Sequence, residues 1–156
     1  MIWINLPKYL IDFVKSQSEL SDDAIRVNSD TFIGRIIYEN LEKVPDGCTY
    51  SFEQTSNRYP LGIDLNTIGG RNEKRIYADR YCYYIPPQSQ RSIETQLTDF
   101  FNHLFYNTLD LSCEYSEAQI KQLIEKFCNK YKIDEVDNYE MLKKRYFRYR
   151  TEKKES

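Results

Sequence analysis

Lysine and arginine side chains are concentrated near the end of the chain, where seven of residues 141–154 are basic and only Glu152 is acidic. At the centre of this segment is the run Lys143-Lys-Arg-Tyr-Phe-Arg-Tyr-Arg150, in which aromatic residues stand among the bases. Cationic side chains neutralise phosphates and release counterions, and their N–H donors can reach base edges. The run therefore predicts binding of a nucleic acid, DNA more than RNA. The predicted contacts are Lys143, Lys144, Arg145, Arg148 and Arg150.

A solvated helix is the other explanation of this charge, because cations at a helix C-terminus complement the helix dipole. The bases nevertheless stand out against the rest of the chain. Residues 1–110 hold 11 Lys/Arg and 15 Asp/Glu, whereas residues 111–156 hold 11 and 9. A basic end on an otherwise acidic protein indicates a polyanionic partner.

A second group of aromatic and basic residues lies in the run Ile76-Tyr-Ala-Asp-Arg-Tyr-Cys-Tyr-Tyr-Ile85, which Arg75 precedes. Tyrosines beside Arg75 and Arg80 could stack on and neutralise a single-stranded nucleic acid. The same run fits a strand whose tyrosines pack against a helix. It also fits a protein-binding surface, since tyrosine is enriched at interfaces. A protein–protein adaptor or structural component with contacts at Tyr81, Tyr83 and Tyr84 is therefore the alternative function.

Catalytic and metal-binding patterns are missing from the sequence. It has no G-x-S-x-G nucleophile turn, and no pair of carboxylates in an apolar setting that would shift a pKa for acid–base work. His103 is the single histidine, and the four cysteines form no C-x-x-C pair, so a zinc site lacks ligands at workable spacing. The spacing around Gly69-Gly70 matches neither the Walker phosphate-binding loop nor the dinucleotide-binding loop. We therefore expect a protein that is not an enzyme and has no cofactor and no metal.

The composition, 40% hydrophobic and 29% charged over 156 residues, is that of one globular domain. The opening Met1-Ile-Trp-Ile4 has no basic segment of the kind that starts a signal peptide, and no apolar run approaches membrane-spanning length. We accordingly expect a cytoplasmic protein with free thiols and no membrane association.

Three helices must position the basic residues. The first, Pro86–Leu109, is predicted by an apolar stripe at helical spacing: Ile93, Leu97, Phe100, Phe101, Leu104 and Phe105. Ser116 and Gln119 form a capping-box pattern at the start of a second helix, 116–131. After a linker, 132–136, a third helix is expected over 137–150, with a buried seam at Tyr139, Leu142, Tyr146 and Tyr149. Two helices joined by a short turn, the second one basic, have the outline of a helix-turn-helix.

The first half of the chain mixes strand and helix patterns. Alternation predicts strands at 2–6, 49–52, 61–65 and 76–85, and a turn at 55–58. Helices are expected from Pro7 to about Gln17, and from N-cap candidates at 28–30 to Leu41, with a polar break at 18–23. The expected fold class is α+β: a small antiparallel sheet packed by helices, followed by a helical C-terminal half. We expect one domain, 1–156, with a mixed part at 1–85 and a helical part at 86–156.

Two resemblances bear on function. The opening Ile2-x-Ile-x-Leu-Pro7 with two helices after it resembles ribbon–helix–helix proteins, whose dimers insert a two-stranded ribbon into DNA; this implies DNA binding by a homo-oligomer. The second resemblance rests on Leu6–Leu10, Phe127, Tyr131, Ile133, Leu142, Tyr146, Arg148 and Arg150. With these residues, most of the chain resembles a group of small uncharacterised proteins of phages and mobile elements in gut Bacteroides-type bacteria. That resemblance implies a phage or mobile-element accessory protein, of which a regulator is one form, and it implies no activity.

Overall fold

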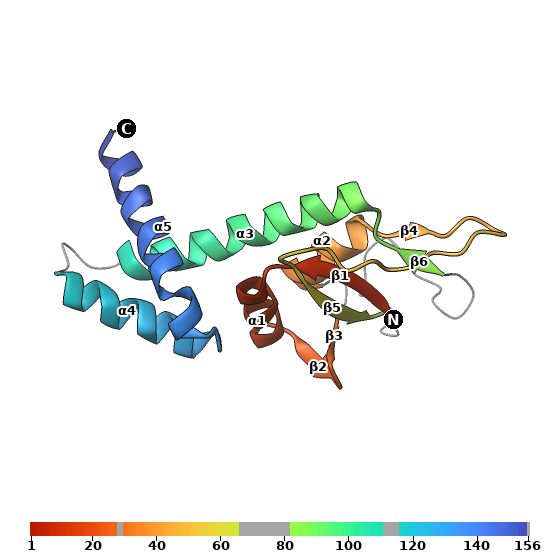
Figure 1. Ribbon diagram of the computed structural model, residues 1–156, viewed down its shortest axis with the longest axis horizontal. Helices are drawn as coiled ribbons and strands as arrows, with labels where there is room; N and C mark the ends of the chain where they lie inside the picture. The colour runs from red at the N-terminus through yellow and green to blue at the C-terminus, as the bar shows by residue number, and fades with distance from the viewer. Residues whose placement is uncertain (28–29, 66–81, 111–115, 156) are drawn as a thin grey trace. The chain divides into compact units, whose positions relative to one another are not determined.

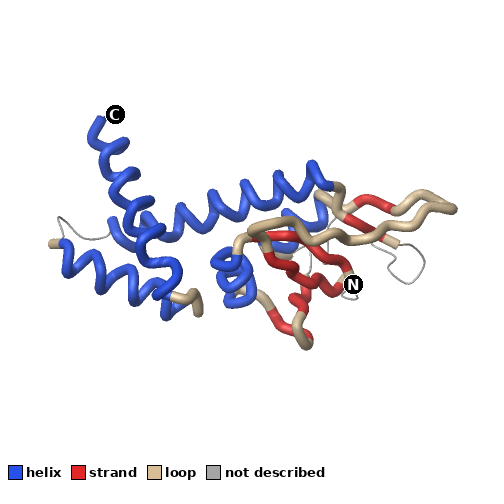
Figure 2. Tube along the Cα trace, viewed as in Figure 1, coloured by secondary structure: helices blue, strands red, loops and turns tan. Residues whose placement is uncertain are grey.

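The computed structural model describes residues 1–27, 30–65, 82–110 and 116–155. In these residues the chain has five helices, a four-stranded sheet and a two-stranded sheet (Figure 1). It divides into two compact units, Met1–Thr98 and Asp99–Ser156, with the boundary inside helix α3, Pro87–Asp110. The described strands all lie in the first unit, and the second unit is helical (Figure 2). The predicted α+β class with a helical C-terminal half is confirmed.

The larger sheet has the strand order β1-β5-β3-β2, formed by Ile2–Leu6, Tyr59–Asp64, Ala24–Arg26 and Glu19–Ser21. Strand β1 pairs antiparallel with β5, placing apolar residues opposite one another, such as Ile4 opposite Leu61. Strands β2 and β3 form an antiparallel hairpin, whereas β3 and β5 run parallel. The sheet is therefore mixed rather than antiparallel. The parallel pair arises because helix α2 and a long connection carry the chain back to the end of the sheet at which β3 began before β5 begins.

Helices α1, Lys8–Ser16, and α2, Phe32–Glu39, bury amphipathic faces in the first unit. The predicted strand at 2–6 and both helices are confirmed. The cap of α2 differs from the prediction: its N-cap is Thr31, whose hydroxyl accepts a hydrogen bond from the Gly34 N–H at 3.0 Å. The buried side chains of the two helices include Leu10, Ile11, Phe13, Val14, Ile33, Ile36 and Ile37.

Two strand predictions in the first unit were wrong. The polar stretch 18–23, expected to break the pattern, contains β2 and a two-residue turn in which Asp22 adopts a left-handed backbone (φ 53°). A hairpin of this kind is set by its turn, which aspartate tolerates, more than by apolar alternation. Residues 49–52 form no strand. Their aromatic side chains instead contact rings elsewhere in the unit: Tyr50 lies 4.8 Å from Tyr84, and Phe52 lies 6.4 Å from Trp3 between ring centroids.

A small second sheet joins β4, Glu42–Lys43, to β6, Tyr83–Tyr84. Beyond β4, the chain runs through a loop that ends at β5 (Figure 2). Of the strand predicted at 76–85, residues 82–85 are described, and Tyr83–Tyr84 among them form β6. The rest of that strand, with Arg80 and Tyr81, lies outside the described residues, as do Arg75 and the Gly69-Gly70 pair.

The second unit is organised by a cluster of aromatic rings on three helices: α3 from Asp99 onward, α4, Glu117–Lys130, and α5, Glu135–Glu155. Phe127 lies 5.4 Å from Phe101 and 5.1 Å from Phe105 in edge-on geometry, and 4.7 Å from Tyr131. The predicted stripe on α3 therefore packs largely as expected. Ile93, Leu97, Phe101 and Phe105 are buried along α3, while Phe100 and Leu104 are half-buried.

The thiol of Cys128 is enclosed in this core. Burial, with the carboxylates of Glu135 and Asp134 as smaller causes, raises its pKa from 9.0 to about 11. Because the thiolate is the reactive form, we expect Cys128 to react with iodoacetamide far more slowly than Cys48 and Cys82, which are exposed. The neutral thiol also contributes stability that should be lost as the pH rises from about 9 toward 11, because the unfolded chain releases that proton first.

Mass spectrometry of alkylated peptides would follow these rates at about pH 8 in a Cys113→Ser variant. Equal rates at the three remaining thiols would contradict the expected protection of Cys128. A Cys128→Ala variant, unfolded by urea across the same pH range, is the control for the loss of stability.

Candidate functional site

The turn between α4 and α5 sets where the basic helix begins. Lys132 adopts a left-handed backbone (φ 56°), the Ile133 N–H donates to the Cys128 carbonyl at 2.9 Å, and the Lys132 N–H donates to the Asn129 carbonyl at 3.4 Å. These two bonds form a Schellman motif, which ends α4 and turns the chain tightly. Buried Ile133 anchors the turn in the core. The short turn expected between these helices is therefore present.

Helix α5 begins at Glu135 rather than at the predicted Asp137, and it continues to Glu155 instead of ending at Arg150. The start moves because the Asp134 carboxylate accepts a hydrogen bond from the Asp137 N–H at 3.3 Å, three residues on, as an N-cap residue does. The capping box predicted at the start of α4 is confirmed, with Ser116 and Gln119 bonded reciprocally at 3.3 and 2.9 Å.

The buried seam of α5 follows the prediction at its centre. Leu142 and Tyr146 are buried, while Tyr139 and Tyr149 are half-buried at the two ends. The Tyr149 ring stacks on Tyr106 with 4.0 Å between centroids and 3° between planes. This seam determines which of the basic side chains can point outward.

Five bases of α5 lie outside its buried seam, some beside the seam and some on the exposed side of the helix. On a helix with 3.6 residues per turn, positions 143, 147, 150 and 154 form one row, and positions 144 and 148 form the adjacent row. Lys144, Arg148 and Lys154 are exposed, Lys143 and Arg150 are half-buried, and half-buried Phe147 lies among them. We call this surface the basic face; its bases are Lys143, Lys144, Arg148, Arg150 and Lys154.

Arg145, also a predicted contact, lies on a different side of α5. Its Nη1 donates to Asn102 Oδ1 of α3 at 2.9 Å, and its guanidinium carbon is 5.9 Å from the centre of the Phe101 ring. Arg145 therefore connects α5 to α3 within the second unit.

Two members of the basic face also lie over aromatic rings. The Lys143 ammonium is 6.0 Å from the centre of the Tyr139 ring, which it shares with Lys121 of α4 at 5.9 Å. The Arg150 guanidinium is 5.7 Å from the Tyr146 ring. Such contacts hold a cation in place while leaving its charge available.

Lys153, next to the basic face in sequence, is instead engaged by Asp110 at 3.1 Å. The same carboxylate accepts a hydrogen bond from the Tyr149 hydroxyl at 2.7 Å, and this bond raises the pKa of Tyr149. Asp110 thus connects the end of α3 to Tyr149 and Lys153 of α5.

The predicted tyrosine surface is represented by β6. Tyr83 and Tyr84 are both half-buried, and the Tyr84 hydroxyl donates to the Glu42 carboxylate at 3.5 Å. With its ring on Tyr50, Tyr84 contributes to packing around the β4–β6 sheet. Tyr81, Arg75 and Arg80 lie outside the described residues.

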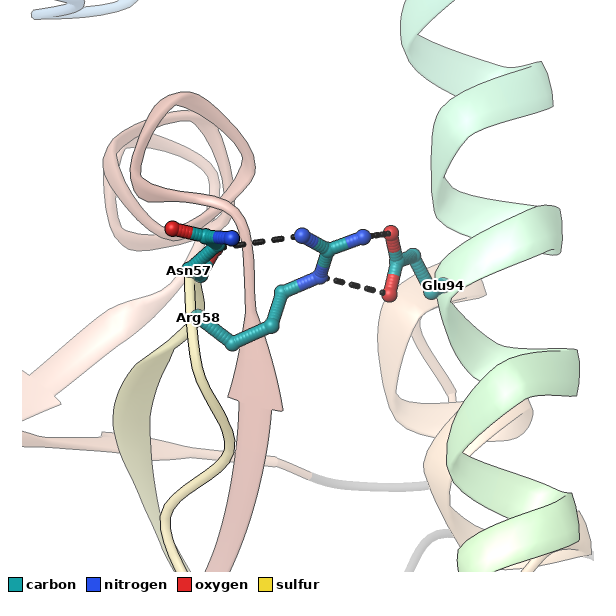
Figure 3. Close-up of polar contacts among 3 residues, drawn as sticks. All are labelled: Asn57, Arg58 and Glu94. Atoms are coloured by element: carbon teal, nitrogen blue, oxygen red, sulfur yellow. Dashed lines mark hydrogen bonds and ion pairs between the residues drawn. The ribbon is translucent and has the colours of Figure 1, made fainter.

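A second candidate site was not predicted from the sequence. A cavity of about 660 Å³ lies in the first unit between β1, the loop 50–58 and the first turns of α3. At its wall Arg58 Nη2 and Nε bind the two carboxylate oxygens of Glu94 at 2.9 and 3.2 Å, and Arg58 Nη1 donates to the Asn57 carbonyl at 3.1 Å (Figure 3). The signal that could have pointed here is Asn5, a polar residue between the apolar Ile4 and Leu6 of a short strand.

Throughout the described ranges, no group of three or more His, Cys, Asp or Glu side chains is placed to hold a metal ion. None of the helices that the structure describes is both long enough and apolar enough to cross a bilayer. Comparison of the chain with protein-family models, with curated proteins and with solved structures found no match. Function is therefore inferred from the side chains described above.

Proposed function

We propose that the protein binds nucleic acid through the basic face of α5. The observation that carries this proposal is a set of five bases on α5 outside its buried seam, of which Lys144, Arg148 and Lys154 are exposed. Lys144 and Arg148 are the central pair, because both are exposed and neither forms a hydrogen bond or ion pair with another described residue. In the phage or mobile-element setting that the sequence resemblance implies, such a protein would be an accessory factor or regulator.

The charge distribution along α5 supports this role. Helix dipole compensation needs cations only in the last turn, whereas the basic face begins twelve residues before the end of the helix at Glu155. A solvated helix end therefore does not account for Lys143 and Lys144.

The size of the basic face suits a DNA duplex. From position 143 to position 154 the helix rises about 16 Å, which spans roughly five phosphates along one strand. The major groove of B-form DNA admits an α-helix, whereas the major groove of an RNA duplex is too narrow for side-chain readout. Half-buried Phe147 supplies an apolar contact among the bases. Duplex DNA is thus the favoured ligand.

The test is a fluorescence-anisotropy titration of the full chain with duplex DNA, single-stranded DNA and duplex RNA over a range of salt concentrations. We expect binding to duplex DNA to weaken steeply with salt, with a log–log slope of about −4 for roughly five neutralised phosphates. The double variant Lys144→Glu with Arg148→Glu should bind about 100-fold more weakly at low salt and show a smaller slope.

The matched control is a charge reversal at Lys126, an exposed lysine of α4 in the same unit. It changes the net charge in the same direction without touching the basic face, so its effect should be several-fold smaller per charge. An equal loss per charge would show that binding depends only on net charge. No binding of any of the three nucleic acids at low salt would contradict the proposal, and Tyr83 and Tyr84 would then be tested as a protein contact.

A further inference from the structure

Most of the side chains that line the cavity of the first unit carry a hydrogen-bonding group, although carbon atoms supply more than half of its surface. Tyr50 and Pro87 are among its lining residues, and its volume of about 660 Å³ lies within the range of small-molecule sites. The polar wall comes from three separate segments: Asn5 of β1, the loop 51–58, and one face of α3. Its principal members are Asn5, Glu53, Arg58, Gln90, Arg91 and Glu94.

Asn5 is the feature that points to a ligand. It is only 6% exposed, and its backbone N–H and side-chain Nδ2 both donate hydrogen bonds while its side-chain Oδ1 accepts none within the described part of the chain. The backbone N–H donates to Gln90 Oε1 at 3.2 Å and Nδ2 donates to the Glu53 carbonyl at 2.9 Å, whereas buried Oδ1 has no donor among the described residues. Leaving such an acceptor unpaired destabilises the folded state. Asn5 already lines the cavity, so a ligand with a hydrogen-bond donor could satisfy its Oδ1 from there.

The segment that accepts the hydrogen bond from Asn5 Nδ2, residues 50–58, forms neither a helix nor a strand, so it can shift without unfolding either. It is held to β1 by the bond from Asn5 to Glu53 and by the contact of Phe52 with Trp3. A small shift of Glu53 would open Oδ1 to the cavity. The Arg58–Glu94 pair, by contrast, fixes the end of the segment against α3.

The charges of the wall are balanced, which selects for a neutral ligand. Arg58 and Arg91 are matched by Glu53 and Glu94, so an anion would meet two carboxylates and a cation would meet two guanidinium groups. An apolar ligand would leave the polar wall unpaired. A hydroxyl group both donates and accepts hydrogen bonds, so a molecule with many hydroxyls can satisfy the wall and Asn5 Oδ1 together.

We propose that this cavity binds a small neutral polyhydroxylated molecule, a sugar, with one hydroxyl donating to Asn5 Oδ1 and a C–H face against Tyr50. Arg91, which is exposed and forms no hydrogen bond or ion pair with other described residues, supplies further donors at the rim. The site lies wholly within the first unit and is independent of nucleic-acid binding by α5. Its ligand is a free sugar or the end of a glycan, which share this chemistry.

The experiment follows the side-chain amide signal of Asn5 in nitrogen-15 correlation spectra of the full chain. The probes are glucose, galactose, N-acetylglucosamine, maltose and cellobiose as free sugars, and cellohexaose as a glycan fragment. We expect a saturable shift of the Asn5 signal and of the backbone amides of 50–58 below about 10 mM of at least one probe. A stronger response to cellohexaose than to the free sugars would identify a glycan end as the source.

Three variants locate the binding. Ser56→Trp places a large ring at the cavity wall and should abolish the shifts of residues 50–58, whereas Ser92→Trp, on an exposed position of α3 outside the cavity, should preserve them. Asn5→Leu removes Oδ1 and should weaken binding at least tenfold by the same backbone signals, even if Ser56→Trp does not fold. The proposal is overturned if no sugar gives a saturable shift, if Asn5→Leu binds as well as the wild type, or if only nucleoside monophosphates bind.

Discussion

Replacing Phe127 with alanine is expected to lower the free energy of unfolding by about 3–5 kcal/mol, as is typical for deletion of a large core aromatic side chain. The ring is 1% exposed and stands at the centre of the second unit's core. Its edge-on contacts with Phe101 and Phe105 and its tilted contact with Tyr131 would all be lost. Helices α3 and α4 contribute these rings, so the cavity left behind cannot close by movement of one side chain. Urea unfolding followed by circular dichroism would measure the change.

The matched control is Phe147→Ala on α5, because its ring is only half-buried. This substitution should lower the free energy of unfolding by about 1 kcal/mol, which is typical of a single substitution. Equal losses for the two variants would contradict the placement of Phe127 at the centre of this core. The Phe147→Ala variant also tests the proposed function, because it should weaken DNA binding while leaving the helix folded.

Replacing Asn5 with aspartate is expected to have a comparable effect although it changes only one group. At neutral pH the new carboxylate would be buried and without a donor, and it would face the Glu53 carbonyl to which Asn5 Nδ2 now donates. An uncompensated buried charge costs about 3–5 kcal/mol. The variant should therefore be severely destabilised at pH 7.

The destabilisation by Asn5→Asp should depend on pH. Burial would raise the pKa of the new carboxyl in the folded state above its unfolded value of about 3.9, so the folded state would bind the proton more tightly. The destabilisation relative to the wild type should be largest above the folded-state pKa and should shrink as the pH falls toward about 4. Urea unfolding at several pH values would measure it.

Asn5→Leu is the control, since it replaces the amide by an apolar group of similar size. Removing both the donor and the unpaired acceptor should be nearly neutral or stabilising, apart from the bond lost to Glu53. A wild-type stability for Asn5→Asp at pH 7, with no change on acidification, would show that water reaches this position freely. The comparison also separates stability from sugar binding, which Asn5→Leu should lose.

Elements that depend on neighbours in the chain were predictable from the sequence. The spacing of Ile93, Leu97, Phe101 and Phe105 identified α3, because helical periodicity is a local property. The capping box of Ser116 and Gln119 was predictable for the same reason, since three residues separate its two partners. The positive charge of α5 was equally plain from composition.

Features that depend on pairing between distant segments were decided by the tertiary structure. The β2–β3 hairpin lies in a polar stretch, and the parallel register of β3 with β5 joins strands separated by α2 and a long loop. Periodicity carries no information about which strands become neighbours, so the sheet was expected to be antiparallel and is mixed. Likewise, residues 49–52 alternate like a strand, but their rings are used against Trp3 and Tyr84.

The same division applies to the two candidate sites. The amphipathic and basic character of the C-terminal helix could be predicted from its residues alone. Only packing decided that Arg145 bonds to Asn102, 43 residues away, while Lys144 and Arg148 face outward. The cavity depended on tertiary structure altogether, because Asn5 meets Glu53 across 48 residues and Gln90 across 85. Contacts at such separations follow from how whole elements pack, and a single sequence carries no local signal for them.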